Sequence, residues 1–307
     1  MNEMTSYLGW KMDYASPKGE AAFLHPSSMA WRIYKNPIAL GIGGVAAVLL
    51  EFADARIRSG VWDHSTYKAD PIGRSKRTGT AAMVGVYGPQ SAARRVIQGV
   101  TNMHARVNGA TPSGEAYKAL DPELLDWVAA TAAYGFVNAY DRFVQPLTEA
   151  EMARFWNEGS QIPSLYGVQN SPRSTADFMA MMEKLAPRFE PHPIVTEFLE
   201  IIQSGRAAPS VPKFLHRALA RASVSLLPPI VREKLQLGKE FDLTFADRLA
   251  LKAAGRLAER AFRADSPPAQ ASTRLGLPAD FLWRKPAEQQ RLLREAGLAE
   301  PRAAEAA

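Results

Sequence analysis

PIALGIGGVAAVLL, residues 37–50, is the most apolar run of the chain and decides how the rest of it must fold. Its 14 residues fall short of the roughly 18–20 apolar residues that a helix needs to span a bilayer. Three of them are glycines, which allow a second backbone or a flat ligand to approach closely. The stretch therefore predicts a helix buried in the core of a globular protein.

Helix signals continue on both sides of this run. The apolar pattern extends into charged residues and predicts a helix over 39–57. Asp121 and Pro122 supply a cap and a first helical residue for a helix that runs to about Tyr140, and Thr148 caps the next one. Further helices are predicted over 74–86, 91–107, 175–186, 193–204, 211–222, 228–238, 244–264 and 286–297. Segment 159–175 is predicted as a loop, and no convincing alternating strand is present, so the fold class is all-α.

The amino-acid composition excludes several kinds of metal site and catalytic site. The chain of 307 residues is 47% hydrophobic and 22% charged, as in an ordinary soluble globular protein. It has no cysteine, which excludes disulfides, zinc–thiolate sites, iron–sulfur clusters, cysteine nucleophiles and thiolate-bound haem. The first 20 residues lack the basic region and apolar core of a signal peptide, so we expect a cytoplasmic location.

The net charge of +6 comes mainly from the later part of the chain. Two basic stretches, KFLHRALARA (213–222) and RLALKAAGRLAERAFRA (248–264), alternate with apolar residues at helical spacing. Solvated helix faces explain this pattern, and peripheral contact with an anionic membrane surface is a second explanation. We expect His216, on the first basic helix, to be exposed. No nucleic-acid-binding motif is present, so nucleic acid is not an expected partner.

Two sets of residues are candidates for a site. His104 is one of only five histidines and has apolar Val100 and Val107 about one turn away. It is either a core histidine bonded to a carbonyl or a ligand to a metal or haem. Arg74, Arg77 and Thr78 share one side of a predicted helix, where they form either an anion cradle or a solvated basic helix end.

A haem would use both sets together. Its iron requires a neutral imidazole, its two propionates require partners such as Arg or Tyr, and its porphyrin faces require apolar contact. The sequence offers each of these. It offers no two-His-one-carboxylate pattern at helical spacing, so a non-haem iron site has less support.

Six stretches in the same order carry a resemblance to a known family. They are FLHP (23–26), GVWDHS (60–65), DPIGRSKRT (70–78), YGPQSAARRVIQGVTNMHARVNG (87–109), YKALDPELLDWV (117–128) and FVQPLTEAE (143–151). Over roughly residues 20–200 the chain resembles the bacterial and fungal haem oxygenases that include the latex-clearing rubber oxygenases and the mycophenolic-acid-pathway oxygenase.

The resemblance implies roles for individual residues. His104 matches the histidine that binds the iron of haem b on the proximal side, so it is the expected metal ligand. Arg74 and Thr78 match the haem-pocket helix, and with His104 they are the expected cofactor-binding residues. Arg77 stands where rubber oxygenases have a distal Lys. Because Arg does not become a neutral ligand, it would bond to dioxygen or anchor a propionate.

His64 matches the histidine of the family's GVxxHS stretch. It has either a role in the pocket or a helix-capping or hydrogen-bonding role, and with Arg77 it is a candidate catalytic residue. Many members have a histidine where this chain has Ala129, so chemistry assigned to that histidine does not carry over.

These expectations combine into one architecture and one function. We expect an all-α globular bundle around a buried haem pocket, as a single domain over 1–300 with a family-like core at about 20–200, C-terminal helices over 201–300 and a disordered tail at 301–307. The expected activity is a haem b-dependent oxygenase that uses dioxygen to cleave a C=C bond or to hydroxylate an apolar small molecule. The alternatives are a haem carrier or sensor without turnover and a cofactor-free helical lipid-binding protein. The sequence does not assign an oligomeric state.

Overall fold

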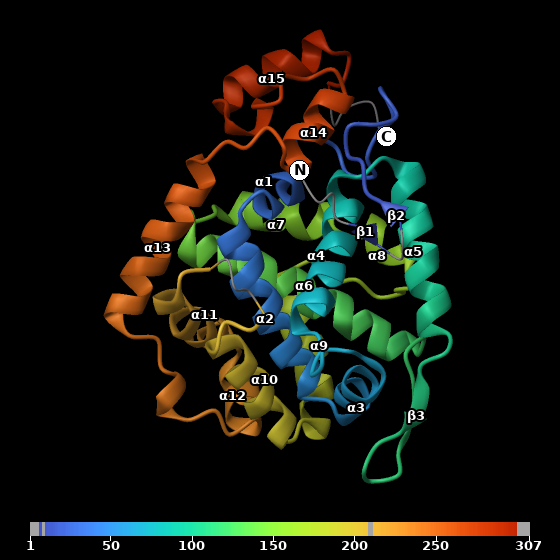
Figure 1. The fold of residues 1–307 in the computed structure, drawn as a ribbon, viewed down its shortest axis with the longest axis vertical. Coiled ribbons are helices and arrows are strands. Elements are labelled where there is room, and N and C mark those ends of the chain that lie inside the picture. The colour runs from blue at the N-terminus through green and yellow to red at the C-terminus, as the bar shows by residue number, and fades with distance from the viewer. Residues whose placement is uncertain (1–5, 8–9, 208–210, 300–307) are drawn as a thin grey trace.

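Two long helices, α2 (Pro37–Phe52) and α6 (Pro122–Phe143), cross at the centre of the molecule (Figure 1). At their crossing Gly43 faces Gly135, and a Cβ on Gly43 would lie only 2.6 Å from the carbonyl oxygen of Gly135. A Cβ on Gly135 would in turn collide with the carbonyl oxygen of Gly43. Only glycine permits this approach, so the predicted buried helix packed closely on a second backbone is confirmed.

The computed structural model describes residues 6–7, 10–207 and 211–299, and the predicted all-α fold is confirmed for them. The tail at 301–307 lies outside the described residues. The other α-helices are α1 (Met29–Tyr34), α3 (Ala55–His64), α4 (Pro71–Tyr87), α5 (Gln90–His104), α7 (Glu149–Glu158), α8 (Gln161–Leu165), α9 (Thr175–Leu185), α10 (Pro193–Gln203), α11 (Lys213–Ser225), α12 (Pro229–Lys234), α13 (Phe245–Arg260), α14 (Pro267–Arg274) and α15 (Pro286–Glu295).

Short elements complete the described part of the chain. Three 3₁₀ turns are η1 (Ala186–Arg188), η2 (Lys239–Phe241) and η3 (Phe281–Trp283). Two small antiparallel hairpins pair β1 (Ser6–Tyr7) with β2 (Trp10–Lys11) and β3 (Asn108–Ala110) with β4 (Ala116–Lys118). None of the described helices is long and apolar enough to cross a membrane.

Local capping fixes where the main helices begin. The Asp121 side chain accepts hydrogen bonds from the first backbone N–H groups of α6, with Pro122 as its first residue. Thr148 and Glu151 form a capping box at the start of α7. Both predicted caps are confirmed. The predicted helix over 39–57 divides in two, because Asp54 accepts from the backbone N–H of Arg56 and starts α3 as a separate helix.

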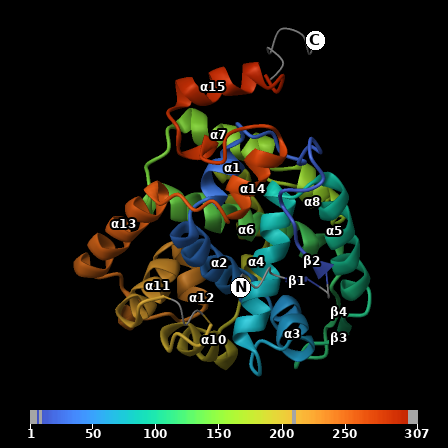
Figure 2. The ribbon, with the colours of Figure 1, turned by 45° about the horizontal axis from the view of Figure 1, so that its top comes forward.

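The helices enclose two apolar cores. The first core joins α2 and α6 to α9, α10 and α11. The second core joins α1, α4 and α5 to the N-terminal segment, α14 and α15. Figure 1 shows α14 and α15 at one end of the molecule, above α1, and in the turned view of Figure 2 α15 again lies at that end. The buried guanidinium of Arg274 ties this end together by donating to the carbonyl oxygens of Tyr14, Glu20 and Tyr87.

Three expectations differ from the structure. The segment predicted as a loop at 159–175 contains the short helix α8, and α1 and α14 were not predicted, because helices of five to eight residues are too short to show a clear apolar period. His216 is buried rather than exposed. Gly205, in a left-handed conformation, lies so close to its imidazole that a Cβ there would collide with the ring.

Candidate functional site

Arg74 lies at the centre of the candidate site. Helix α4 begins after Asp70, whose carboxylate accepts from the backbone N–H of Gly73 at 2.8 Å. Arg74 follows in the first turn, and its guanidinium lies close enough to three groups from different parts of the chain to lower their pKa values. These groups are Glu51 on α2, Tyr67 in the connection before α4, and His104 at the end of α5.

Glu51 is a carboxyl group enclosed between helices. Burial raises its pKa to about 7, although Arg74 and Thr131 oppose part of this rise. The Thr131 hydroxyl lies 3.2 Å from the Glu51 carboxyl and 2.8 Å from the carbonyl oxygen of Val128. Because a hydroxyl has one proton, Thr131 donates to only one of them at a time. When the Thr131 hydroxyl donates to Val128, a protonated Glu51 carboxyl can donate to the Thr131 oxygen. Glu51 and Thr131 therefore share a proton that is exchangeable near neutral pH.

The sequence reasoning did not identify Glu51 or Thr131. The signal for Glu51 was present, because it is the lone acidic residue at the end of the apolar run that forms α2. An acidic side chain in such a place is rarely buried without a partner. Its partner is 80 positions away along the chain, so no local pattern could have identified it.

His104 is the last residue of α5, and its imidazole is half-buried. The predicted helix over 91–107 extends three residues beyond it, but α5 ends at His104 and the chain turns into β3 shortly after it. Burial and the neighbouring Arg74 lower the pKa of His104. The imidazole is therefore neutral at neutral pH, which is the form that binds a metal.

A stripe of small and apolar side chains lies along α6 next to these groups. Its members recur every three or four residues and are Leu125, Val128, Ala132 and Phe136. They remain partly accessible although α6 runs through the middle of the bundle. A similar stripe on α2 consists of Gly44 and Val48 and ends at the carboxyl group of Glu51. The two stripes are adjacent, because a Cβ on Gly44 would be 3.8 Å from the Phe136 ring and because Thr131 meets Glu51. They offer an apolar surface beside Arg74.

The other predicted residues have partners near the start of α4 and at the end of α3. Thr78 is exposed, and its hydroxyl donates to the carbonyl oxygen of Arg74 at 3.1 Å. Arg77 donates to the Thr66 hydroxyl at 2.6 Å. The Nε2 of His64, at the end of α3, is 3.2 Å from the Tyr117 hydroxyl. The structure thus places His104 and Glu51 within electrostatic reach of Arg74, and it holds Arg77 against the hydroxyl of Thr66 and His64 against the hydroxyl of Tyr117.

The residue types around Arg74 suit some metal groups and not others. Among the described residues, no three His, Asp or Glu side chains are grouped as ligands of a metal ion. A haem does not need such a group, because its porphyrin supplies four nitrogen ligands and the protein supplies one imidazole. One neutral histidine beside a guanidinium and an apolar stripe therefore fits a haem and does not fit a bare metal ion.

Two surface pockets lie elsewhere in the described part of the chain. One of about 310 Å³ borders α13, and one of about 450 Å³ borders α12. Neither is lined by Arg74 or His104.

One comparison with known proteins gives a match. The family described as "ER-bound oxygenase mpaB/B'/Rubber oxygenase, catalytic domain" matches residues 31–260. This is more than half of the chain, and it includes Arg74, His104, Glu51 and Thr131. No curated protein and no solved structure matches the chain.

Proposed function

The chain belongs to the family of ER-bound oxygenase mpaB/B' and rubber oxygenase catalytic domains, and we propose that it is a haem b-dependent oxygenase acting on an apolar organic substrate. The family match confirms the resemblance found in the sequence and supports oxygenase chemistry in general. The haem and the class of substrate are inferences from the residues around Arg74. The observation that carries them is the half-buried imidazole of His104 at the end of α5, within electrostatic reach of the Arg74 guanidinium.

His104 would bind the iron, and Arg74 would face the acidic edge of the macrocycle. Thr78 lies one turn along α4 from Arg74 and would be the second contact from that helix. When bound, haem b supplies an iron centre at which dioxygen can be activated. The apolar stripes of α6 and α2 would receive the organic substrate and exclude water from it.

Three further side chains would handle protons and hydrogen bonds. The Glu51 carboxyl group, with its pKa raised to about 7, can take up or release a proton near neutral pH beside Thr131. Arg77 and His64 are the candidates for contact with the reacting oxygen atoms. Each would first exchange its present hydroxyl partner, which is Thr66 for Arg77 and Tyr117 for His64.

The haem assignment is tested by comparing two histidine variants after reconstitution of the protein with haem. His104→Ala should lose the Soret band or shift it strongly, because the iron would lose its protein ligand. His192→Ala is the matched control, because His192 is also half-buried and burial also lowers its pKa, but its Nδ1 accepts from the backbone N–H of Ile194 at the start of α10. The control should keep the wild-type spectrum.

The same experiment separates the alternatives. Full haem occupancy with an unchanged iron spectrum in His104→Ala would refute the assigned ligand. A wild-type protein without a Soret band after haem is supplied would instead indicate a cofactor-free lipid-binding protein. A bound haem that takes up no dioxygen in its ferrous form would indicate a carrier or sensor.

Mass spectrometry of products distinguishes the two possible reactions. Cleavage of a C=C bond places both atoms of dioxygen in two new carbonyl groups and needs no external electrons. Hydroxylation places one oxygen atom in the product and reduces the other to water, so it needs two electrons from a donor. Labelled dioxygen supplied with an unsaturated hydrocarbon, with and without a reductant, therefore shows which reaction takes place.

A further inference from the structure

Helix α13 has an inner face that fixes it to the bundle. Three residues spaced by four, Leu251, Gly255 and Glu259, face inward. Leu251 is fully buried, and a Cβ on Gly255 would collide with the carbonyl oxygen of Phe143. Glu259 forms an ion pair with Lys35 at 2.9 Å. These contacts determine the rotation of α13 about its axis and so determine which residues point outward.

The outer face of α13 exposes large apolar side chains. Phe245, Leu249 and Leu257 are 83%, 61% and 72% exposed. Their spacing in multiples of four places them along one line of the helix. A 16-residue helix is about 24 Å long, so the line extends over much of that length. Isolated exposed apolar residues are ordinary, whereas an aligned set on one helix marks a contact surface.

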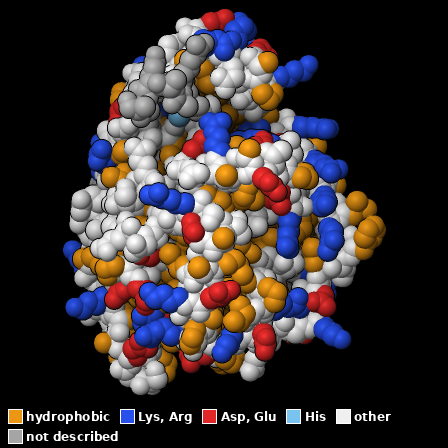
Figure 3. Space-filling model, turned by 180° about the vertical axis from the view of Figure 1, so that it is seen from behind, with side chains coloured by type: hydrophobic (Ala, Val, Ile, Leu, Met, Phe, Trp, Pro, Cys, Tyr) orange, Lys and Arg blue, Asp and Glu red, His pale blue; other side chains and the backbone are white. Residues whose placement is uncertain are grey.

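A row of basic side chains runs beside this line. Its members are also spaced by four: Arg248, Lys252, Arg256 and Arg260. Within the described parts of the chain, none of the four has a carboxylate at ion-pair distance. Figure 3 shows apolar and basic side chains gathered at the edge of the molecule that α13 forms. The row therefore carries positive charge that the described part of the chain does not neutralise.

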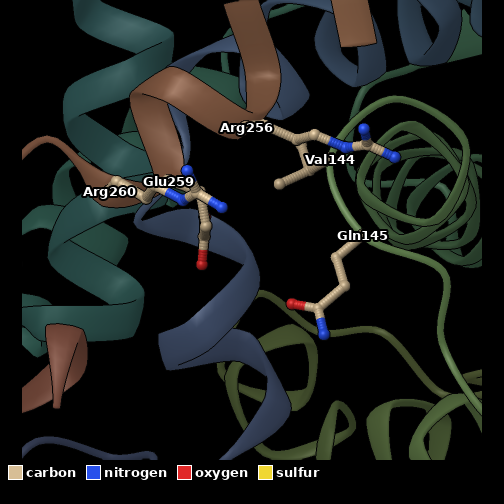
Figure 4. A pocket seen from close by; sticks show the side chains of 5 residues that line it. All are labelled: Val144, Gln145, Arg256, Glu259 and Arg260. Atoms are coloured by element: carbon tan, nitrogen blue, oxygen red, sulfur yellow. The ribbon is translucent and has the colours of Figure 1, made fainter. Parts of the chain in front are cut away.

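The pocket of about 310 Å³ lies at the end of this row (Figure 4). Arg256, Glu259 and Arg260 line it from α13, and Val144 and Gln145 line it from the chain after α6. The charge of Glu259 is already balanced by Lys35. Two guanidinium groups with planar donor sets suit the phosphate of a lipid headgroup.

We propose that α13 lies flat on the surface of a membrane that contains anionic phospholipids. Phe245, Leu249 and Leu257 enter the acyl boundary, and the basic row contacts headgroup phosphates, with one phosphate in the pocket at Arg256 and Arg260. A helix with an apolar line and a cationic flank binds an interface in this way. A second copy of the chain is a poorer occupant, because a two-fold pairing of α13 brings two unneutralised cationic rows together.

This inference does not depend on haem, and vesicle flotation tests it with the full chain. Wild type should float with vesicles of equal parts phosphatidylcholine and phosphatidylserine, and not with vesicles of phosphatidylcholine alone. The triple variant Phe245→Ser, Leu249→Ser, Leu257→Ser should partition roughly tenfold more weakly. Arg248→Gln with Arg256→Gln and Arg260→Gln should weaken binding similarly and remove its dependence on salt. All of these changes are on the surface, so thermal melting should stay close to that of wild type.

Ile230→Ser on α12 is the control, because it removes an exposed apolar side chain that belongs to neither row. It should float like wild type. Equal flotation with neutral and anionic vesicles, or no flotation with either, would overturn the proposal. A concentration-dependent dimer that the apolar triple variant abolishes, without vesicle binding, would assign the surface to a second copy and also overturn it.

Discussion

Replacing Gly43 by Ala should destabilise the protein although alanine is the better helix former. The new Cβ would lie 2.6 Å from the carbonyl oxygen of Gly135, so α2 and α6 must separate by roughly 0.5–1 Å or deform to restore contact distance. Overpacking against side chains costs about 1–3 kcal/mol, and here the upper end applies because the obstacle is backbone. The gain in helix propensity of about 1 kcal/mol offsets part of this. The free energy of unfolding should therefore fall by about 2 kcal/mol.

Gly41 supplies the control within the same helix. A Cβ on Gly41 meets nothing within 4 Å. Gly41→Ala should therefore have only the effect of alanine's higher helix propensity and should stabilise the protein by about 0.5–1 kcal/mol. Urea unfolding of both variants should separate them by about 3 kcal/mol on opposite sides of wild type. If Gly43→Ala proved as stable as Gly41→Ala, the close crossing of α2 and α6 would be wrong, and with it the position of Glu51 and Thr131.

Two further predictions concern buried polar groups. Because the pKa of Glu51 is raised to about 7, the stability from its protonated form is present below its ordinary pKa and is lost as the pH rises through 7. Urea unfolding at several pH values should thus show Glu51→Gln equal to wild type near pH 4 and more stable by about 3 kcal/mol above pH 8, which is the free energy that corresponds to a pKa raised from 4.5 to about 7; a constant difference would contradict this. Arg274→Met should cost about 3–4 kcal/mol by the same assay, because it leaves the carbonyl oxygens of Tyr14, Glu20 and Tyr87 without their buried donor. An unchanged urea midpoint would show that these bonds add nothing.

Local signals in the sequence were sufficient for much of the fold. The caps at Asp121 and Thr148 were predicted because a capping side chain bonds to backbone groups two or three residues away. The three glycines of the apolar run predicted a close approach by a second backbone or a flat ligand, and the structure shows a second backbone at Gly43. The division at Asp54 was missed, since the apolar pattern continues across it and only the bonded turn interrupts the helix.

Local sequence patterns identified only some of the residues of the candidate site. Arg74 and His104 were identified as residue types in recognisable local patterns, and the structure brings them together. Glu51 and Thr131 meet across 80 positions of sequence. The pKa of Glu51 depends on the burial that this meeting creates, and burial is a property of tertiary packing.

The location of the site between the two cores explains why its residues come in two pairs. Glu51 and Thr131 are on α2 and α6, whose buried residues belong to the first core, whereas Arg74 and His104 are on α4 and α5, whose buried residues belong to the second. Side chains between two separately packed units can remain partly accessible without creating a void in either unit. A flat cofactor would then require adjustment between the two cores and little repacking within them. For the same reason Gly43→Ala, which acts inside the first core, should lower stability whether or not haem is bound, and His104→Ala should change haem binding with little effect on the unfolding of the cofactor-free protein.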